Sequence, residues 1–325
     1  MRIKRNTEVI NLDNCSLSDR NGIYGGNAGD KEGIIFENNY WFVKYPKNIR
    51  ELKNIDMSYS TSPLSEFIGS HIYDILGYDV HETFLGKRNN KIVVACKDFC
   101  KKRGSLMEMR TLKNVYNEKL REELDQTFSS TSDSHKIEID EIVTHLKYNP
   151  ILSNINGIST RFWDMMVIDI FIANNDRNNG NWGVLYDNDK YELAPIFDNG
   201  SSFHNRTSDE KMKKMMVNEK NFDGTMINTM TTFSKDGHEL TAKKIILSDE
   251  YPELNEAIKR NVPLIKDCFD KIKKMIIDIP NEYDGIEIMS DIRKEYYIKT
   301  CLWNRCTRYE GRSRGYSTRI RKGRY

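Results

Sequence analysis

With 325 residues, the chain is long enough to bury a full hydrophobic core, either in one large domain or in two lobes. Hydrophobic residues make up 38% of the sequence and aromatic residues 10%, which excludes a disordered protein. The 50 Lys and Arg residues nearly balance the 48 Asp and Glu residues, so net charge alone indicates neither a nucleic-acid nor a membrane partner.

The sequence carries no signal for secretion or for a membrane span. No window approaches the roughly 18 uninterrupted apolar residues of a span, and the opening residues MRIKRNTEVINLDN lack the apolar centre of a secretory signal. The 6 cysteines are sparse for this length and fit reduced thiols. We therefore expect a cytoplasmic protein whose cysteines are small buried or semi-buried thiols. Structural zinc at the pair Cys96 and Cys100 or at the pair Cys301 and Cys306 is the weaker alternative.

A glycine-rich segment, GIYGGNAGDKEG at 22–33, precedes two predicted strands within 34–46. These strands are expected to turn at Asn38-Asn39 and to place Lys44 near the end of the second. Glycines let backbone N–H groups approach a phosphate closely. A glycine-rich turn followed by a strand with a lysine is how kinase-like folds cover a triphosphate, although an ordinary hairpin with a surface lysine fits the same residues.

Residues 62–77 predict a helix, because apolar residues recur at helical spacing along SPLSEFIGSHIYDILG. Ser62 is the expected N-cap, Pro63 suits the first helical position, and Gly77 suits the C-terminal stop. Glu66 lies beside the apolar stripe, where it is within reach of Lys44 or serves only as a favourable charge near the helix start.

Two further strands are predicted at 81–86 and 91–99, and the continuously apolar second one is expected to be central in its sheet. The polar stretch CKDFCKKRG at 96–104 suits a hinge between an N-terminal lobe and a larger helical lobe. Residues 127–135 are rich in Ser and Thr, which predicts a solvated loop that also offers phosphate acceptors.

The centre of the chain combines a buried element with polar turns. The apolar run 162–172 predicts a buried helix, and it stops at the turn-forming residues 174–181. Two short strands are expected at 182–186 and 191–197, the second ending on Asp198. A loop bearing Asp176 and Asn181 should therefore lie close to Asp198.

The remaining sequence predicts helices at 211–216, at 252–279 with a break at Pro263, and at 290–303. The tail 305–325 is strongly basic, with tyrosines among its arginines. Such a tail is typical of a segment that binds nucleic acid or an acidic partner, and equally of a solvated basic end.

Phosphoryl transfer needs cations to neutralise the triphosphate, carboxylates to hold Mg²⁺, and one carboxylate to orient the attacking hydroxyl. The chain offers these groups in a suitable order, which predicts a phosphoryl-transfer centre built from five residues: Lys44, Glu66, Asp176, Asn181 and Asp198.

The string NNDRNNGNWG, followed by PIFDNGSS, resembles the HipA-type kinases, especially the compact CtkA-like Ser/Thr kinases. The resemblance also includes FVKYP, SEFIGSHIYDILG and KIVVACKDF, and it covers roughly residues 20–205. It implies an α+β, two-lobed protein-kinase-like fold with a small β-rich N-lobe at 1–104, a larger helical catalytic lobe at 105–304 and the basic tail at 305–325.

The resemblance further implies an ATP- and Mg²⁺-dependent kinase that phosphorylates Ser or Thr in a protein, including itself. Asp176 would be the catalytic base, with Asn181 and Asp198 holding Mg²⁺ and Lys44, paired with Glu66, contacting the phosphates. The residues implied to cover the phosphates are Gly25, Gly26, Asn27 and Gly29, and those implied to flank the adenine are Ala95, Lys97 and Asp98.

Two departures from the family pattern limit these implications. Asn178 stands where the family commonly has His after the Asp-Arg pair, and the segment before the glycine-rich loop is short for the extra subdomain of larger HipA toxins. Two alternatives therefore stay open. DRNNGNW also resembles the catalytic loop of type II phosphatidylinositol 4-kinases, which would make a lipid or small alcohol the acceptor. An inactive kinase-like module that binds nucleic acid or protein is the other.

Overall fold

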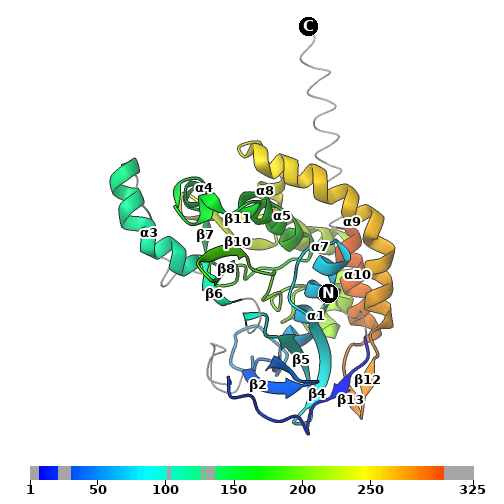
Figure 1. Cartoon of the computed structure of the whole chain (residues 1–325). Coiled ribbons are helices and arrows are strands. Elements are labelled where there is room, and N and C mark those ends of the chain that lie inside the picture. Colours follow the sequence, from blue (N-terminus) through cyan, green and yellow to red (C-terminus); the bar gives the residue numbers. More distant parts are fainter. Residues whose placement is uncertain (1–6, 21–30, 101–103, 126–127, 129–135, 304–325) are drawn as a thin grey trace.

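The structure is a computed structural model that describes residues 7–20, 31–100, 104–125, 128 and 136–303. It has the predicted α+β composition in two parts. Figure 1 shows a β-rich N-terminal part at one end and a mostly helical C-terminal part at the other, with helix α1 (Ser62–Ile75) between them. The lobe boundaries at 104 and 304 stay predictions, and the tail 305–325 lies outside the described residues.

The N-terminal part is a five-stranded sheet in the order β1-β4-β5-β3-β2. Its strands are β1 (Ile10–Asn11), β2 (Lys31–Phe36), β3 (Asn39–Lys44), β4 (Thr83–Arg88) and β5 (Lys91–Lys97). The apolar β5 is central, as predicted.

Two antiparallel hairpins, β2–β3 and β4–β5, account for most of this sheet. Each turns on two residues in the left-handed region, namely Glu37 and Asn38 (φ 46° and 57°) and Asn89 and Asn90 (φ 50° and 56°). Such turns match the twist of the strands that they join. The first hairpin thus turns one residue earlier than predicted, and Lys44 still ends β3.

Helix α1 is nearly all buried, since it packs against β4 and β5 on one side and against α9 (Pro252–Asp278) on another. Its N-cap is Thr61 and not the predicted Ser62, which already belongs to the helix. Gly77 follows the helix with φ +87°, a left-handed conformation that glycine adopts without strain. The predicted helix is confirmed with a one-residue shift at its start.

The C-terminal part begins with β6 (Ser105–Glu108), α3 (Met109–Leu124), β7 (Ile137–Glu138), α4 (Ile139–Tyr148), the 3₁₀ turn η1 (Leu152–Asn154) and α5 (Ile158–Phe171). It continues with β8 (Gly183–Asp187), β9 (Lys190–Leu193), α6 (Asp209–Val217), α7 (Glu219–Ile227), β10 (Met230–Lys235), β11 (His238–Thr241) and α8 (Ala242–Leu247). Helix α9, the hairpin β12 (Glu282–Tyr283) with β13 (Ile286–Glu287), and α10 (Asp291–Trp303) complete it. In the described part of the chain, no helix is both long enough and apolar enough to span a membrane.

Two predictions about this part are wrong. The strand expected at 191–197 ends at Leu193, because the chain then leaves β8 and turns toward the N-terminal part, where Ile196 N donates to Asp79 O at 2.9 Å. Asp198 therefore follows an irregular segment. Helix α9 is also unbroken at Pro263, since its apolar face packs against α5 and α1 and outweighs one missing N–H donor.

Candidate phosphoryl-transfer site

The N-terminal half of the site is an ion-pair cluster centred on Lys44. The Lys44 Nζ lies 2.6 Å from Glu66 Oε2 and 2.8 Å from Asp198 Oδ1. These three residues come from the end of β3, from the start of α1 and from the segment after β9. The structure thus brings together three of the predicted site residues that lie far apart in sequence.

The charges in this cluster hold one another in the ionised state. Burial alone would raise the pKa of Glu66, but Lys44 and His81 outweigh burial and hold that pKa below its ordinary value. Burial likewise opposes ionisation of Asp198, yet the Lys44 ammonium lowers its pKa. Burial would lower the pKa of Lys44, and the two carboxylates raise it instead. A charged lysine is therefore maintained where phosphates would bind.

Two glycines allow helix α1 and the 198–200 segment to meet this closely. A Cβ atom on Gly69 would lie 2.8 Å from the Cβ of Asn199, and one on Gly200 would lie 3.1 Å from Glu66 Oε2. Real Cβ atoms essentially never come as close as the first of these distances. Gly69 is therefore a condition for placing the 198–200 segment against α1.

The second half of the site is the loop 174–181, which follows α5. Asn178 Nδ2 donates to Asp176 Oδ1 at 3.2 Å, and Asn181 Nδ2 donates to Asp176 O at 2.6 Å. Gly180 N donates in turn to Asn178 Oδ1 at 2.8 Å. Asn178, the residue that departs from the family pattern, thus contacts the predicted base Asp176 directly and links it by hydrogen bonds to Gly180.

Arg177 joins the two halves, and the sequence analysis assigned it no role. It is fully buried, and its guanidinium donates to both oxygens of Asp169 at 2.7 and 3.1 Å. Its Nη1 donates to Asn181 O at 2.8 Å and to Phe197 O at 2.5 Å. One side chain therefore holds the loop with Asp176 beside the residue that precedes Asp198.

The sequence signal for this arrangement was Asp169, one of two acids within the mostly apolar helix α5. A buried carboxylate needs a cationic or hydrogen-bonding partner. Tyr73 OH and Asn174 Nδ2 each add a hydrogen bond of 3.0 Å to Asp169 Oδ1. Asp169 is thus the anchor that fixes Arg177.

The residues predicted to flank the adenine lie at the end of β5 and directly after it. Ala95 is buried in the sheet opposite Val43, and Lys97 forms an ion pair of 2.9 Å with Glu82. Asp98 forms an ion pair of 2.8 Å with Arg20. The side chains of Lys97 and Asp98 are therefore already paired, and their backbone N atoms donate to Glu82 O and Tyr40 O, each at 2.9 Å. The predicted glycine-loop residues Gly25, Gly26, Asn27 and Gly29 lie outside the described residues.

Lys31 is a further cation that the sequence analysis missed. It begins β2 and pairs in register with Lys44 on β3. Burial and the nearby Lys44 ammonium lower the pKa of Lys31 below its ordinary value. Among the described residues, the Lys31 ammonium makes no hydrogen bond or ion pair; Lys31 is held through its backbone in the β2–β3 ladder. Two lysines therefore face the same site, and only Lys44 is paired with acids.

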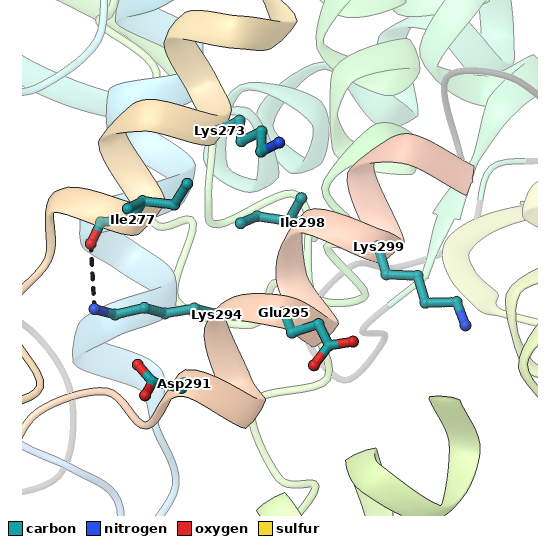
Figure 2. Close-up of a pocket in the computed structure, with 7 residues that line it drawn as sticks. All are labelled: Lys273, Ile277, Asp291, Lys294, Glu295, Ile298 and Lys299. Carbon is teal, nitrogen blue, oxygen red and sulfur yellow. Dashed lines mark hydrogen bonds between the residues drawn. The ribbon is translucent and has the colours of Figure 1, made fainter. Parts of the chain in front are cut away.

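A separate hollow of about 590 Å³ lies between α9 and α10 (Figure 2). Ile277 and Ile298 supply its apolar lining, and Lys294 Nζ donates to Ile277 O at its edge at 3.2 Å. None of the predicted site residues lines it. It is therefore distinct from the cluster around Lys44.

The β-rich lobe carries a lysine–glutamate pair, and the helical lobe carries Asp176 in a loop and Asp198 in a turn. This combination defines a kinase-like phosphotransferase. The chain is 31% identical over 303 residues to serine/threonine-protein kinase CtkA of Helicobacter pylori (strain J99 / ATCC 700824). That alignment covers 89% of this chain and 82% of the relative. The chain therefore belongs to the CtkA family of HipA-like kinases and is a phosphotransferase. No protein-family model matches it.

Solved structures agree with this assignment. The crystal structure of the Helicobacter pylori proinflammatory kinase CtkA superposes with a TM-score of 0.78 at 26% identity, covering 95% of this chain and 99% of that chain. A chain from the Shewanella oneidensis MR-1 complex of HipA, HipB and operator DNA gives a TM-score of 0.50 at 13% identity, covering 89% of this chain and 67% of that one. The second likeness shows the fold alone. The predicted family and the predicted two-lobed kinase-like fold are confirmed.

Proposed function

We propose that the chain is an ATP- and Mg²⁺-dependent protein kinase that transfers the γ-phosphate of ATP to a Ser or Thr hydroxyl of a protein. The observation that carries this proposal is Lys44, whose ammonium contacts Glu66 and Asp198 at once, at 2.6 and 2.8 Å. A lysine held between a helix glutamate and a metal-binding aspartate is the arrangement that protein kinases require.

In this proposal the cations of the N-terminal lobe bind the triphosphate. Lys44 contacts the phosphates, Lys31 adds a second positive charge from the neighbouring strand, and Glu66 keeps the Lys44 amine in place. The predicted loop Gly25, Gly26, Asn27 and Gly29 covers the phosphates through its backbone N–H groups. Residues 95–98 flank the adenine.

Asn181 and Asp198 would hold the metal ion, and their free oxygen atoms fit that role. The described residues leave Asn181 Oδ1 and Asp198 Oδ2 without a hydrogen bond, because Asn181 bonds through Nδ2 and Asp198 through Oδ1. Carboxylate and amide oxygens are ligands that Mg²⁺ accepts. The Asp198 side chain is 35% exposed, so it remains open to a ligand. Bound Mg²⁺ would neutralise charge on the phosphates.

Asp176 is the proposed base. Its carboxylate would accept the proton of the acceptor hydroxyl while the hydroxyl oxygen bonds to the γ-phosphorus and the bond to the ADP oxygen breaks. Asn178 orients that carboxylate through its 3.2 Å hydrogen bond to Oδ1. In autophosphorylation the acceptor would lie in this chain; the loop predicted for it, 127–134, lies almost wholly outside the described residues.

The test is transfer of labelled phosphate from ATP in the presence of Mg²⁺, with a generic protein acceptor and with phosphatidylinositol vesicles in parallel. Asp176→Asn and Asp198→Asn should each lower turnover by about 10² to 10⁴-fold. Asp187→Asn, at the exposed end of β8, should leave turnover unchanged. Wild-type transfer no greater than in the two site variants, with no nucleotide binding, would refute the proposal. Transfer to vesicles alone would favour the lipid-kinase alternative.

A further inference from the structure

We propose that His81 is a positioning residue for the Lys44–Glu66 pair and that it acts on Lys44 through the second oxygen of Glu66. This inference rests on the proposed function, because it assigns His81 to the same site. His81 lies on the segment between α1 and β4, and no feature of the sequence pattern distinguished it. Its side chain is only 2% exposed, so it cannot contact a substrate from solvent.

The two oxygens of Glu66 have separate partners. His81 Nε2 lies 2.9 Å from Oε1, and the backbone N of Asn199 donates to the same oxygen at 2.9 Å. Oε2 accepts a hydrogen bond from Lys44 Nζ at 2.6 Å. Because the carboxylate is planar and rigid, two donors on Oε1 determine the direction in which Oε2 points. The position of Lys44 therefore depends on what holds Oε1.

The hydrogen-bond pattern also assigns the tautomer of His81. An ionised Glu66 only accepts hydrogen bonds, so Nε2 must carry the hydrogen. Nδ1 is then the unprotonated nitrogen, and it is buried without a hydrogen-bond partner among the described residues. A second proton on Nδ1 would be a buried donor without an acceptor. The structure thus directs the Nε2–H of His81 toward Glu66.

A continuous chain of contacts fixes His81 relative to the other half of the site. Its Nε2 also lies 3.0 Å from Ser70 Oγ, which accepts from Asn199 Nδ2 at 3.0 Å. Arg177 Nη2 donates to the Oδ1 of the same Asn199 at 2.5 Å. The group that orients Glu66 is thereby linked to the arginine that holds the loop with Asp176. Buried hydrogen-bond networks of this kind rigidify the groups that they join.

The same atoms could instead be considered a metal site, because ligand atoms of Glu66, His81 and Cys96 lie within 4.8 Å of one another. Two observations oppose that assignment. Both Glu66 oxygens already accept hydrogen bonds, and the Lys44 ammonium lies 2.6 Å from one of them. Burial also raises the pKa of the Cys96 thiol, which disfavours the thiolate that a metal would need. A positioning role accounts for all these contacts.

The experiment compares His81→Phe, which fills the space without a donor, with His81→Gln, whose amide can donate in place of Nε2. Residues that orient a metal ligand without touching the metal typically contribute about tenfold or more to activity, and we expect an effect of that size for a residue that orients Glu66. We expect His81→Phe to lower kcat/KM for ATP about tenfold without changing KM for the acceptor, and His81→Gln to restore most of the loss. His71→Phe, at a buried histidine within α1, is the matched control and should leave both parameters near wild type.

A double-mutant cycle with Glu66→Gln separates positioning from a general structural role. If His81 acts through Glu66, His81→Phe should change kcat/KM by less than about twofold in the Glu66→Gln background. An unchanged tenfold loss in that background, or a Gln variant as poor as the Phe variant, would overturn the inference. All variants are compared well below their melting temperatures.

A second measurement keeps this inference separate from the proposed function. If wild type transferred no phosphate, the kinase proposal would fail, but NMR of ¹⁵N-histidine-labelled protein would still test His81. Its signal, assigned with His81→Gln, should show the Nε2–H tautomer and should shift in Glu66→Gln. An Nδ1–H tautomer, or a signal unaffected by Glu66→Gln, would overturn the positioning role whether or not the chain is active.

Discussion

Replacing Arg177 with lysine tests whether the two halves of the site depend on one buried guanidinium. Arg177 makes hydrogen bonds to Asp169, Asn181 O, Phe197 O and Asn199. A lysine keeps the charge for Asp169, but it cannot reproduce the planar fork that reaches the other three acceptors. We therefore expect Arg177→Lys to fold with a loosened loop 174–181.

The size of the effect follows from those lost contacts. Each buried acceptor left without a donor costs about 1–3 kcal/mol, and breaking a buried ion pair outright costs about 3–5 kcal/mol. Arg177→Lys retains the pair and loses the other contacts, so we expect a loss of about 3 kcal/mol in the free energy of unfolding. Turnover should fall by about 10²-fold, because small misplacements of catalytic groups have effects of that size.

Urea unfolding and phosphate transfer, measured on the same preparations, would check both numbers. Arg260→Lys is the matched control, because Arg260 also pairs with a helix α5 acid, Asp164, but its side chain is 47% exposed. Exposed pairs contribute at most about 1 kcal/mol, so this control should unfold near the wild-type urea midpoint. An Arg177→Lys protein with wild-type midpoint and wild-type turnover would refute the reasoning.

Two further predictions concern other titratable residues. Lys31→Met should raise KM for ATP about fivefold or more, since removing one charge-assisted contact costs at least about 1 kcal/mol. Lys91→Met, on the same sheet, is the control and should leave KM unchanged. Equal KM values for wild type and Lys31→Met in steady-state assays would exclude a phosphate contact by Lys31. Burial, and then Lys113, lower the pKa of His145 to about 4. Between pH 6.5, the ordinary pKa of His, and about pH 4, this histidine is protonated in the unfolded chain but not in the folded protein. The free energy of unfolding should therefore decrease as pH falls through this window, by about 2–3 kcal/mol in all. His145→Leu should flatten that part of the urea-midpoint profile, and an equally steep profile would contradict the assignment.

Local sequence patterns were sufficient for the elements that carry Lys44 and Glu66. Helix α1 has an apolar stripe bounded by a proline and a glycine, and the hairpin β2–β3 has a polar turn between two apolar runs. Both signals arise from residues near one another in sequence. The one-residue shifts at Thr61 and at Glu37 reflect the imprecision with which such signals mark boundaries.

Elements defined by distant partners could not be predicted in the same way. The end of β9 is set by Asp79, which takes Ile196 away from the hairpin, and no pattern within 191–197 encodes that partner. The short strand β7 exists only because it pairs in parallel with β10, almost a hundred residues later in the chain. Helix α9 continues past Pro263 because of the faces of α1 and α5 that cover it.

The groups that hold the site were harder to predict than the groups that we propose to perform the chemistry. Asp176, Asn181 and Asp198 lie in polar turns, where such residue types commonly indicate a functional site. Arg177 stands in the same polar run, where an arginine is ordinarily a solvated charge. Only its fully buried position in the structure shows that Arg177 holds the two halves of the site together.

The sequence nevertheless contained one usable signal for such groups. Helix α5 is apolar along most of its length but includes Asp164 and Asp169, and an acid in a buried helix must find a partner elsewhere. Each acid does so: Asp164 pairs with Arg260 at 2.6 Å, and Asp169 pairs with Arg177 at 2.7 Å. An acid within a mostly apolar helix therefore predicts a cationic partner outside that helix. In this chain, that inference leads from Asp169 to the arginine that joins the two halves of the site.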